Sequence, residues 1–525
     1  MPILGIFASQ NYLRSLTVDY LVVAGGGGSG GEAGAGGGGG GYLTSVGTQG
    51  GGGSAASPLS LALNTSFTVT VGAGGAGGTS TGGSGGGLGG NGTNSVFSTI
   101  TSTGGGGGSG YPSSGVSIDG NAGGSGGGGG NGGSGSVGLG GAASSPTQGY
   151  AGGTGAYTFP NGRGMGGGGG AGSVGVNGVT ATGAGGNGGA GITSSISGTS
   201  VGRAGGGGGA GQTTQGTGTD GGGTNSAGTV NTGGGGSDNY TFNGGAAGGS
   251  GIVIARYSGT VQKAYGGTVT TSGGNTIHTF NSSGVFYTGT TVPVSGSAFW
   301  IDAADASTFT YSSGTRVSEW RDKSGNARHM TQATSAYQPD RNATQNSLSA
   351  VIMRSGSAKY WMRNTSYNWA GSAFTMLCVV KPYTGDYTAF LGQDAAAHLQ
   401  IGQDSSLPAQ LAISRIGQAS SLSNLTLDNG VTGQITYKSS GISSGNVTVQ
   451  IYKSKTAASG TVSLSSLSNN TIAMIGGSRS DLAPSTLDTY GDGGYLCEML
   501  VYPSQLSDTD RVAVENYLIA KWGVS

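Results

Sequence analysis

The sequence predicts a mainly β protein in two parts, an N-terminal glycine-rich block and a C-terminal β-sandwich that ends in one helix. The first observation is composition, since 123 of the 525 residues are glycine and 96 of these lie in residues 1–257. The second is a series of short alternating strands after residue 293, separated by turn residues. All five Trp also follow residue 293, so only the second part can bury a standard core.

The glycine block is bounded by strand-like runs at 18–24, 66–71 and 251–257. Composition alone leaves a flexible linker open. Collagen is excluded because a strict Gly-X-Y period is missing and the chain has only 11 Pro. A calcium-binding β-roll is excluded because the Asp residues of the tracts are not in phase: Asp119, Asp220 and Asp238.

The ordered structure that fits these glycine tracts is a bundle of packed polyglycine II helices, clamped by the short strands. Such a helix has three residues per turn and no internal hydrogen bonds, so its backbone must bond to neighbouring helices. Glycine lets the backbones approach closely enough to do so. Ordering glycine costs more entropy than ordering any other residue, so only a cooperative bundle offsets that cost.

The second part reads as strands with one terminal helix. Ser507 is the expected N-cap of a helix that runs to Lys521 and stops at Gly523. Residues 258–292 are expected to bridge the two parts, with a hairpin that turns at Asn281 to Gly284. The expected strands are 298–302, 374–381, 388–392, 409–416, 433–438, 446–453, 471–476 and 495–502.

Charge and hydropathy exclude several classes of function. The net charge is +0, which gives no basic surface for nucleic acid or for an anionic membrane. No window has the ~20 apolar residues of a membrane span, and the first ten residues lack a basic signal region, so no membrane insertion and no general secretory export are expected.

Cys378 and Cys497 are expected to be buried free thiols, and a disulfide bridge between their two strands is left open as the alternative.

The pattern of acidic residues and histidines does not predict an enzyme. Only Glu319, Glu498 and Glu515 follow residue 258, and none has an acidic neighbour two residues away, as paired glycosidase carboxylates on one strand would. The three His residues, His278, His329 and His398, are scattered and give no zinc or catalytic-triad spacing.

The first part resembles the glycine-rich tail-fibre and adhesin proteins of tailed phages, especially marine ones. The resemblance rests on four stretches in order: Met1-Pro2-Ile3-Leu4-Gly5-Ile6, Tyr20-Leu21-Val22-Val23-Ala24-Gly25, Thr68-Val69-Thr70-Val71-Gly72 and Gly251-Ile252-Val253-Ile254-Ala255-Arg256-Tyr257. It implies a virion protein that contacts other tail proteins through residues 1–17, carries the glycine domain over 18–257, and forms a homo-oligomer, often a trimer.

The second part, 293–525, resembles the concanavalin A-like or laminin G-like jelly rolls of phage and bacterial surface proteins. The matching stretches are Trp300-Ile301-Asp302-Ala303-Ala304-Asp305, Glu319-Trp320-Arg321-Asp322-Lys323-Ser324-Gly325-Asn326, Glu498-Met499-Leu500-Val501-Tyr502 and Asn516-Tyr517-Leu518-Ile519-Ala520-Lys521-Trp522-Gly523. The resemblance implies the fold and leaves the ligand open.

Two candidate sites follow. Aromatic and polar residues suited to carbohydrate are Tyr360, Trp361, Arg363, Tyr367, Trp369, Tyr383, Asp386 and Asp394, of which Tyr367 and Tyr383 are the most expected to be exposed, while Trp361 and Trp369 also suit the core. The resemblance also implies a calcium option, for which the candidates are Asp302, Asp305, Asp322 and Asn326, although Asp-Lys-Ser-Gly-Asn also makes a good turn.

The sequence thus predicts a tail fibre or adhesin of a virion, with a glycine spacer and a domain that binds host surface carbohydrate. The alternatives are a purely structural fibre or capsid decoration protein, and a cellular surface adhesin. The expected location is the phage tail, and outside the cell after release.

Overall fold

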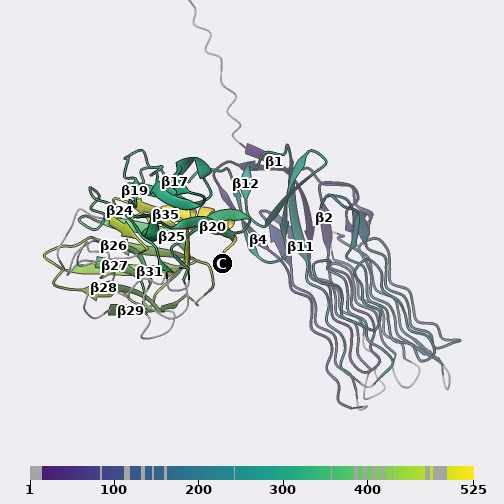
Figure 1. The fold of residues 1–525 in the computed structure, drawn as a ribbon. Helices are drawn as coiled ribbons and strands as arrows, with labels where there is room; N and C mark the ends of the chain where they lie inside the picture. The colour runs from purple at the N-terminus through teal and green to yellow at the C-terminus, as the bar shows by residue number, and fades with distance from the viewer. Residues whose placement is uncertain are drawn as a thin grey trace, which may run out of the picture. The chain divides into compact units, whose positions relative to one another are not determined.

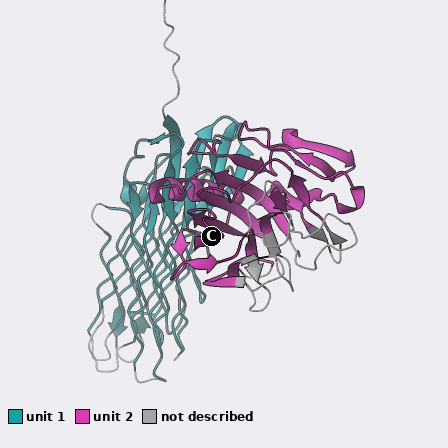
Figure 2. Ribbon diagram, turned by 90° about the vertical axis from the view of Figure 1, so that its left-hand side faces the viewer, with its two compact units in different colours: residues 1–290 teal, residues 291–525 magenta. Residues whose placement is uncertain are grey.

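The computed structural model describes residues 15–524 apart from short segments: 83–84, 112–118, 132–135, 145–146, 159–161, 242, 356–357, 383–387, 394–398, 405–409, 416–419, 428–429, 468–472 and 477–493. The chain divides into two compact units, residues 1–290 and 291–525 (Figure 2). The structure is mainly β with one helix among the described residues, which confirms the predicted fold class.

The first unit is built on two antiparallel sheets. One has the order β13-β14-β11-β1-β2, with β3 also on β1, and the other has the order β12-β15-β4-β5-β6. The strands are β1 (Ser15–Val23), β2 (Tyr42–Thr44), β3 (Leu59–Ala62), β4 (Ser66–Thr70), β5 (Ser95–Phe97), β6 (Ile100–Ser102), β11 (Ile252–Ser258), β12 (Ala264–Tyr265), β13 (Thr268–Ser272), β14 (Asn275–Phe280) and β15 (Gly284–Thr288). Two small hairpins, β7 (Ala156–Thr158) with β8 (Gly162–Gly164) and β9 (Ile192–Ser194) with β10 (Val201–Arg203), and the 3-10 turn η1 (Gly50–Gly52) complete the unit.

The two sheets share one apolar core, which holds the ends of the glycine block together, so the prediction that only the second part buries a core is wrong. β1 and β11 pair antiparallel with Val22 opposite Val253, so the two predicted end strands lie side by side. Val18 and Val22 from one sheet and Phe97 and Phe286 from the other belong to the same buried cluster. Alternating apolar residues on these strands therefore supply the hydrophobic contacts that the glycine tracts lack.

The glycine tracts extend from these strands as long passes that lie side by side (Figure 1). Their hydrogen bonds repeat every three residues, since the N–H groups of Gly25, Gly28 and Gly31 donate to the carbonyls of Thr93, Gly90 and Gly87 at 3.1, 2.9 and 3.0 Å. The two intervening sets of N–H groups donate in the same way to tracts 243–249 and 35–38. Each turn of the tract therefore makes backbone hydrogen bonds in three directions, which is the pattern expected of packed polyglycine II helices.

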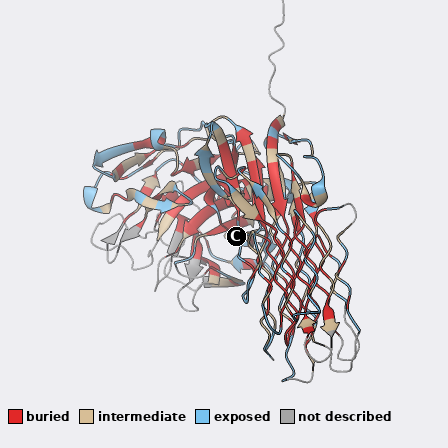
Figure 3. Cartoon of the chain, turned by 90° about the vertical axis from the view of Figure 1, so that its right-hand side faces the viewer, coloured by how far each residue is buried: buried red, intermediate tan, exposed pale blue. Residues whose placement is uncertain are grey.

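The central tract is surrounded on all sides. Its carbonyls accept from three further tracts, at Gly75, Gly105 and Gly236, so it has six neighbours. All residues from Tyr20 to Tyr42 are buried, and the tracts carry much buried backbone, red in Figure 3. Backbone hydrogen bonding replaces side-chain burial here, because nearly every interior peptide group is paired with a neighbouring tract.

The hairpin predicted for residues 273–286 is wrong. β14 pairs with β11 and β13, whereas β15 pairs with β4 and β12, so the residues at the expected turn cross from one sheet to the other. The reason is the shared core, which Phe280 and Phe286 enter from opposite layers. The expected bridging strands thus pair within the first unit.

His278 is a buried imidazole in the middle of this unit. It is 0 % exposed, its Nδ1 lies 2.8 Å from the carbonyl oxygen of Gly266, and its Nε2 lies 3.2 Å from the hydroxyl of Tyr257. A carbonyl only accepts, so Nδ1 carries the proton and Nε2 accepts from Tyr257. Both nitrogens are satisfied by the neutral ring, and burial lowers the pKa of His278 to about 4.

We expect the first unit to lose stability as the pH falls from about 6.5 to 4. Above pH 6.5 the imidazole of His278 is neutral in both the folded and the unfolded chain. Between pH 6.5 and about 4 the imidazole is protonated in the unfolded chain only, and this protonation favours the unfolded state. The loss is on the order of 3 kcal/mol for a shift of this size. Denaturant unfolding at pH 7 and pH 5, with His278→Gln as the comparison, measures it. An equal pH dependence in both proteins would contradict the assignment.

The second unit is a sandwich of antiparallel strands (Figure 1). One layer has the order β21-β35-β25-β30-β31-β33, with β16 also on β35, and the other has the order β17-β18-β19-β24-β34-β26-β27-β28-β29. Its strands are β16 (Phe299–Asp302), β17 (Phe309–Ser313), β18 (Arg316–Trp320), β19 (Met330–Thr331), β20 (Asp340–Gln345), β21 (Leu348–Ile352), β22 (Arg354–Ser355), β23 (Ala358–Lys359), β24 (Met362–Asn364), β25 (Phe374–Lys381), β26 (Thr388–Gln393), β27 (Leu399–Asp404), β28 (Gln410–Arg415), β29 (Ser420–Thr426), β30 (Gly433–Ser439), β31 (Val447–Lys453), β32 (Thr456–Ala457), β33 (Val462–Leu464), β34 (Ala473–Ile475) and β35 (Tyr495–Tyr502).

The helix α1 (Asp508–Trp522) lies against β25 and β30. The Oγ of Ser507 accepts from the N–H of Asp510 at 3.1 Å, and Gly523 ends the helix in the left-handed conformation with φ 62°. Both predicted caps are therefore confirmed. Two 3-10 turns, η2 (Ala306–Thr308) and η3 (Ser335–Tyr337), complete the unit. Among the described residues, no helix is long and apolar enough to cross a membrane.

Candidate functional site

A row of polar side chains crosses four strands of the second unit. The register places Thr310 of β17 opposite Glu319 of β18, Glu319 opposite Thr331 of β19, and Thr331 opposite Arg363 of β24. We call these four residues the polar row. All four are exposed or half-buried, and at about 4.8 Å between strands the row extends over roughly 14 Å.

The next row along the same strands faces the core. Phe309, Trp320 and Met330 lie opposite one another and are buried. The rings of Phe309 and Trp320 are stacked with centroids 5.0 Å apart. Because alternate residues of a strand point to opposite faces, this apolar row fixes the polar row on the outside.

Arg321 holds the acidic residue of the polar row in place. Its Nε donates to Glu319 at 2.8 Å, and its Nη2 donates to the hydroxyl of Thr310 at 3.0 Å. The Arg321 side chain is 48 % exposed, so this ion pair contributes little to stability. Its effect is to set a planar carboxylate and a planar guanidinium side by side at the surface.

Trp361 lies beside the basic end of the polar row. The guanidinium of Arg363 is 5.9 Å from the centre of the Trp361 ring, and the ring of Tyr337 is stacked on it at 6.3 Å. Backbone bonds hold the segment, since the N–H of Trp361 donates to the Tyr337 carbonyl and Gln332 donates to the Trp361 carbonyl, both at 3.1 Å. The indole N–H of Trp361 has no acceptor among the described residues.

The structure brings together two of the eight predicted carbohydrate residues, Trp361 and Arg363. Tyr360 is buried under the guanidinium of Arg316 at 4.9 Å. Trp369 is buried against Phe374 and donates to the Gly392 carbonyl at 3.2 Å, which is a core role. Tyr383, Asp386 and Asp394 lie outside the described residues.

Tyr367 is buried, contrary to the expectation of exposure. It is 4 % exposed because Arg328 covers its ring at 4.2 Å and Phe299 packs against it at 5.6 Å. Burial raises the pKa of the Tyr367 hydroxyl. Its covering residues come from segments some 40 and 70 residues earlier, so the local sequence does not show them.

The sequence reasoning missed Thr310, Glu319, Arg321 and Thr331. The sequence offers only a local signal for these residues, which is the set of polar residues between and beside Val317 and Trp320 in a short strand. That signal identifies an outward face but not which strands lie next to it. The polar row exists only through the cross-strand register.

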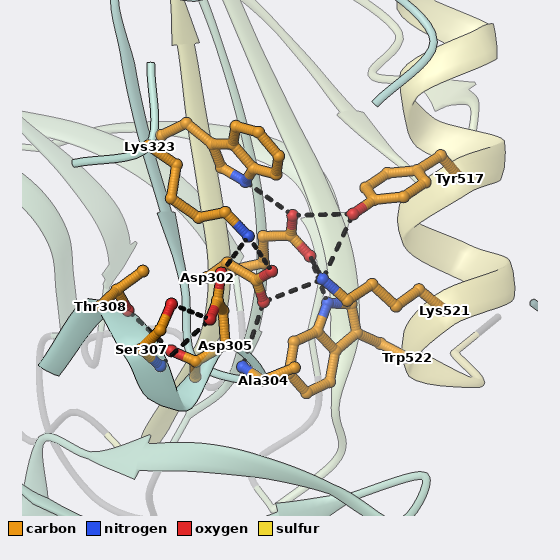
Figure 4. A network of polar contacts seen from close by, with 12 residues as sticks. Asp302, Ala304, Asp305, Ser307, Thr308, Lys323, Tyr517, Lys521 and Trp522 are labelled. Carbon is orange, nitrogen blue, oxygen red and sulfur yellow. Dashed lines mark hydrogen bonds and ion pairs between the residues drawn. The ribbon is translucent and has the colours of Figure 1, made fainter. Parts of the chain in front are cut away.

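Two of the four calcium candidates bind a lysine (Figure 4). The Nζ of Lys323 lies 3.0 Å from Asp302 and 2.9 Å from Asp305, so an ammonium group occupies the space between these carboxylates. Burial disfavours ionisation of Asp305, but Ser307 and Lys323 outweigh it and lower its pKa to about 2. Asp302 also binds Lys521 at 2.8 Å, and the two lysines lower its pKa against the effect of burial.

The other two candidates close a turn. Asp322 accepts from the backbone N–H groups of Trp300, Ser324 and Arg328 at 2.9, 2.9 and 3.0 Å. The Asn326 amide donates to the Ala298 carbonyl at 3.2 Å. Among the described residues, no group of three or more His, Cys, Asp or Glu is arranged to hold a metal ion. Calcium binding stays a prediction from the sequence.

A buried ion network fastens α1 to β16 and β35 (Figure 4). Glu498, which is 0 % exposed, accepts from Trp300, Lys521 and Trp522 at 2.8 Å and from the hydroxyl of Tyr517 at 3.2 Å. Burial and the nearby Asp302 raise the pKa of Glu498 although Lys521 opposes this. All four acceptor positions of the carboxylate are occupied by the chain itself, so the network is structural in kind.

A second buried ion pair and the two cysteines are further buried titratable groups near α1 and β25. Arg511 binds Glu515 at 2.7 Å, and the hydroxyl of Thr436 donates to Glu515 at 2.7 Å. Cys378 and Cys497 are free and buried, and burial raises the pKa of both thiols.

Comparison with solved structures finds matches of low similarity. A sialidase of Trypanosoma rangeli with 2,3-difluorosialic acid is 12% identical, with a TM-score of 0.28 over 44% of this chain and 34% of that chain. A GH54 α-L-arabinofuranosidase is 14% identical, with a TM-score of 0.30 over 44% and 60%. The binding domain of botulinum neurotoxin DC is 12% identical, with a TM-score of 0.26 over 39% and 52%. The chain thus spans about a third of the sialidase and somewhat more than half of the other two.

Comparison of the sequence gives a clearer result for the first unit. A search of the curated proteins finds no match. Residues 8–258 match the profile of a protein family described as a glycine-rich domain, a range that ends with β11.

Proposed function

We propose that this chain is an adhesin whose second unit binds carbohydrate at the polar row and Trp361, and whose glycine lattice is a rigid spacer. The observation that carries the proposal is the polar row itself, a line of hydroxyl, carboxylate and guanidinium groups beside an aromatic ring. Fold alone would not support it, since many functions share one fold.

The chemistry of this surface fits a sugar. A sugar ring presents hydroxyl groups at its edge and apolar C–H groups on its faces. Glu319 and Arg363 offer planar acceptors and donors for hydroxyl groups, and the half-buried indole of Trp361 offers an apolar surface, although its own N–H is buried. A few polar groups beside an aromatic surface is the usual composition of a small-molecule site.

The glycine lattice suits a spacer for a physical reason. Its tracts bond to neighbours along their length and bury few large side chains, with Met165 in a small apolar cluster, so backbone hydrogen bonds are the main resistance of the block to bending. Few of its residues carry charge, and its surface is rich in hydroxyl and amide side chains.

The proposed location and target of this adhesin rest on the resemblance of its sequence to phage tail fibres. We infer a virion protein of a phage tail, held by residues 1–17 to other tail proteins, assembled as a homo-oligomer and directed at a host surface glycan. A purely structural fibre, a capsid decoration protein and a cellular adhesin are the rival assignments. Detection on purified phage particles separates the first two from the last.

Binding rather than hydrolysis is the proposed activity. Glu498 and Glu515 are buried and bound by Lys521 and Arg511, and Glu319 is bound by Arg321. A glycosidase needs one carboxyl group as acid and a second as nucleophile or base, both facing the same sugar bond.

We expect Trp361→Ala and Arg363→Ala each to weaken binding of the full chain to its host polysaccharide about tenfold or more, because each removes a surface or a charged donor that contacts the sugar. Biolayer interferometry against a panel of host surface polysaccharides measures it. Tyr311→Ala is the matched control, since Tyr311 is 39 % exposed but stacks on Phe309. No saturable binding by the parent chain, or equal loss in all three variants, would contradict the proposal and favour a structural fibre.

A further inference from the structure

We infer that the first unit binds a small inorganic anion, of the size and charge of chloride, between Tyr42 and Arg203 of the hairpin formed by β9 and β10. This site is independent of the proposed carbohydrate surface, which belongs to the second unit. The inference is carried by a buried guanidinium group that pairs with no described carboxylate, and by a buried hydroxyl group near it.

Arg203 is buried and poorly paired. It is the last residue of β10, opposite Ile192 of β9, and is 5 % exposed. Its two Nη groups donate to the Val201 carbonyl and the Ser197 hydroxyl at 3.5 Å, beyond the usual length of a hydrogen bond, and its Nε has no acceptor among the described residues. Burial lowers the pKa of Arg203, yet a guanidinium group stays charged in proteins. A full positive charge is therefore kept from water by weak contacts with neutral groups.

The acidic residues of the first unit do not supply the missing charge. Residues 1–290 contain five, all in the part of the chain that the structure describes, and none forms an ion pair with Arg203. Asp220 accepts from the N–H of Gly191 at 2.9 Å, and its Oδ1 would lie 2.0 Å from a Cβ atom on Gly202. Because successive residues of a strand point to opposite faces, Asp220 lies across β10 from the Arg203 side chain. The five acidic residues are Asp19, Glu32, Asp119, Asp220 and Asp238.

The hydroxyl of Tyr42 is a second buried group near Arg203. Tyr42 is 0 % exposed, and its hydroxyl makes no hydrogen bond of ordinary geometry with the described residues. Burial raises the pKa of Tyr42, and the Ser194 hydroxyl and the charge of Arg203 oppose this, so both groups lie near the Tyr42 oxygen. The Oγ of Ser194 already accepts from the N–H of Ile196 at 3.2 Å. The O–H of Tyr42 and the Nε–H of Arg203 are thus neighbouring donors that lack an acceptor.

An anion satisfies these groups better than a water molecule does. It accepts from both donors and adds the negative charge that the guanidinium lacks, whereas water leaves that charge uncompensated. A monatomic anion suits the surroundings, since Tyr42 belongs to a buried apolar cluster with Ala171 and Ala204. The N–H groups of these two alanines already donate to the carbonyls of Ala204 and Thr232, both at 2.8 Å. They offer no donor to the further oxygens of a sulfate or phosphate.

The bound anion joins the β9–β10 hairpin to the strands that hold the ends of the glycine block. Arg203 belongs to the hairpin, whereas Tyr42 begins β2, which pairs with β1. Opening of the hairpin separates the two side chains and releases the anion. The anion therefore lowers the equilibrium constant for opening, by a factor of one plus its concentration divided by its dissociation constant.

Hydrogen–deuterium exchange of the full chain measures this effect. The amides of residues 192–203 are followed while sodium gluconate is replaced by sodium chloride at constant ionic strength. For a dissociation constant of about 10 mM, exchange is expected to slow about 15-fold between about 10 and about 300 mM chloride. Strand β4, in the other sheet of the same unit, is the internal reference and is expected not to change. Sulfate and acetate are tested in parallel and are expected to protect the hairpin less.

Variants assign the effect to Arg203. Arg203→Gln removes the charge and is expected to abolish the chloride dependence. Tyr42→Phe removes one donor and is expected to weaken chloride binding about threefold or more. Arg256→Gln is the matched control, because it removes an equal charge from the same unit at a site where Nη2 binds the carboxylate of Asp19 at 3.0 Å. It is expected to leave the chloride dependence unchanged.

A crystallographic measurement keeps the test decisive even if Arg203→Gln fails to fold. Crystals of the parent chain soaked in bromide are expected to show an anomalous peak in contact with the Nε of Arg203 and the hydroxyl of Tyr42. Absence of that peak, or exchange of the parent hairpin that does not depend on chloride, would overturn the inference. A peak without protection would mark an adventitious ion only and would overturn it too. Equal protection by sulfate would refute the monatomic anion, and equal chloride dependence in Arg203→Gln and Arg256→Gln would reveal a general salt effect instead of a site.

Discussion

Gly27→Ala is expected to destroy the order of the glycine lattice. A Cβ atom on Gly27 would lie 2.1 Å from the carbonyl oxygen and 2.5 Å from the carbonyl carbon of Gly106, well inside van der Waals contact. The Gly106 backbone has no room to retreat, because its N–H donates to Ser125 and its carbonyl accepts from Gly38, each at 2.8 Å. We expect a loss above about 4 kcal/mol in the first unit, since overlap with fixed backbone is at the severe end of single substitutions.

Differential scanning calorimetry of the full chain measures this loss, with the transition of the second unit as internal reference. Gly53→Ala is the matched control. Gly53 has φ −67° and ψ 151°, which any residue adopts, and the nearest atom to an added Cβ would be 3.5 Å away. We expect it to change stability by no more than about 0.5 kcal/mol, or to raise it slightly. Similar transitions for the two variants would contradict the close packing of the tracts.

The elements of this fold could be predicted better than their arrangement. The strand-like apolar runs at 18–24 and 251–257, and the caps Ser507 and Gly523, are local signals, and each produced the expected element. The pairing of glycine tracts has no such signal. A tract of identical residues carries no side-chain code that says Gly27 should bond to Gly38 and Gly236 rather than to other tracts. The choice follows from loop lengths and from the whole lattice.

The same limit applies to the candidate site. Trp361 and Arg363 were found because aromatic and basic residues gather locally in the sequence. Thr310 and Glu319 could not be found in this way, because they become neighbours of Thr331 and Arg363 only through the pairing of strands between residues 310 and 363. Asp302 and Asp305 have the right chemistry for calcium, but Lys323 reaches them from 18 or more residues away. Spacing between acidic residues does not show which cation is nearby.

Lys521→Met is expected to destabilise the second unit by about 3–5 kcal/mol at pH 7. The Nζ of Lys521 is bound by Glu498 and Asp302, both at 2.8 Å, and the side chain is 2 % exposed. Methionine retains the length of the side chain but leaves two buried carboxylates without the cation between them. Removing one partner of a buried ion network costs far more than the network contributes, because the charges that remain cannot reach water.

The pH dependence of this loss has a definite sign. Burial already raises the pKa of Glu498 above its value in the unfolded chain, and loss of Lys521 would raise it further. The folded variant therefore takes up a proton at a higher pH than the unfolded variant does, so its stability relative to the parent should recover as the pH falls from 7 toward 5. Denaturant unfolding at both pH values measures the difference between the two proteins.

Lys438→Met is the matched control for this experiment. Lys438 also lies in the second unit and pairs with Asp508 of α1 at 3.5 Å, but the Asp508 side chain is 74 % exposed. Water replaces the lost partner there, so we expect a loss below about 1 kcal/mol with no recovery at low pH. If both variants lose equally little, the packing of Tyr517 and Trp522 holds α1 in place and the ion network does not. If Lys521→Met alone is severe and recovers on acidification, the buried charges fasten the helix to the sheet.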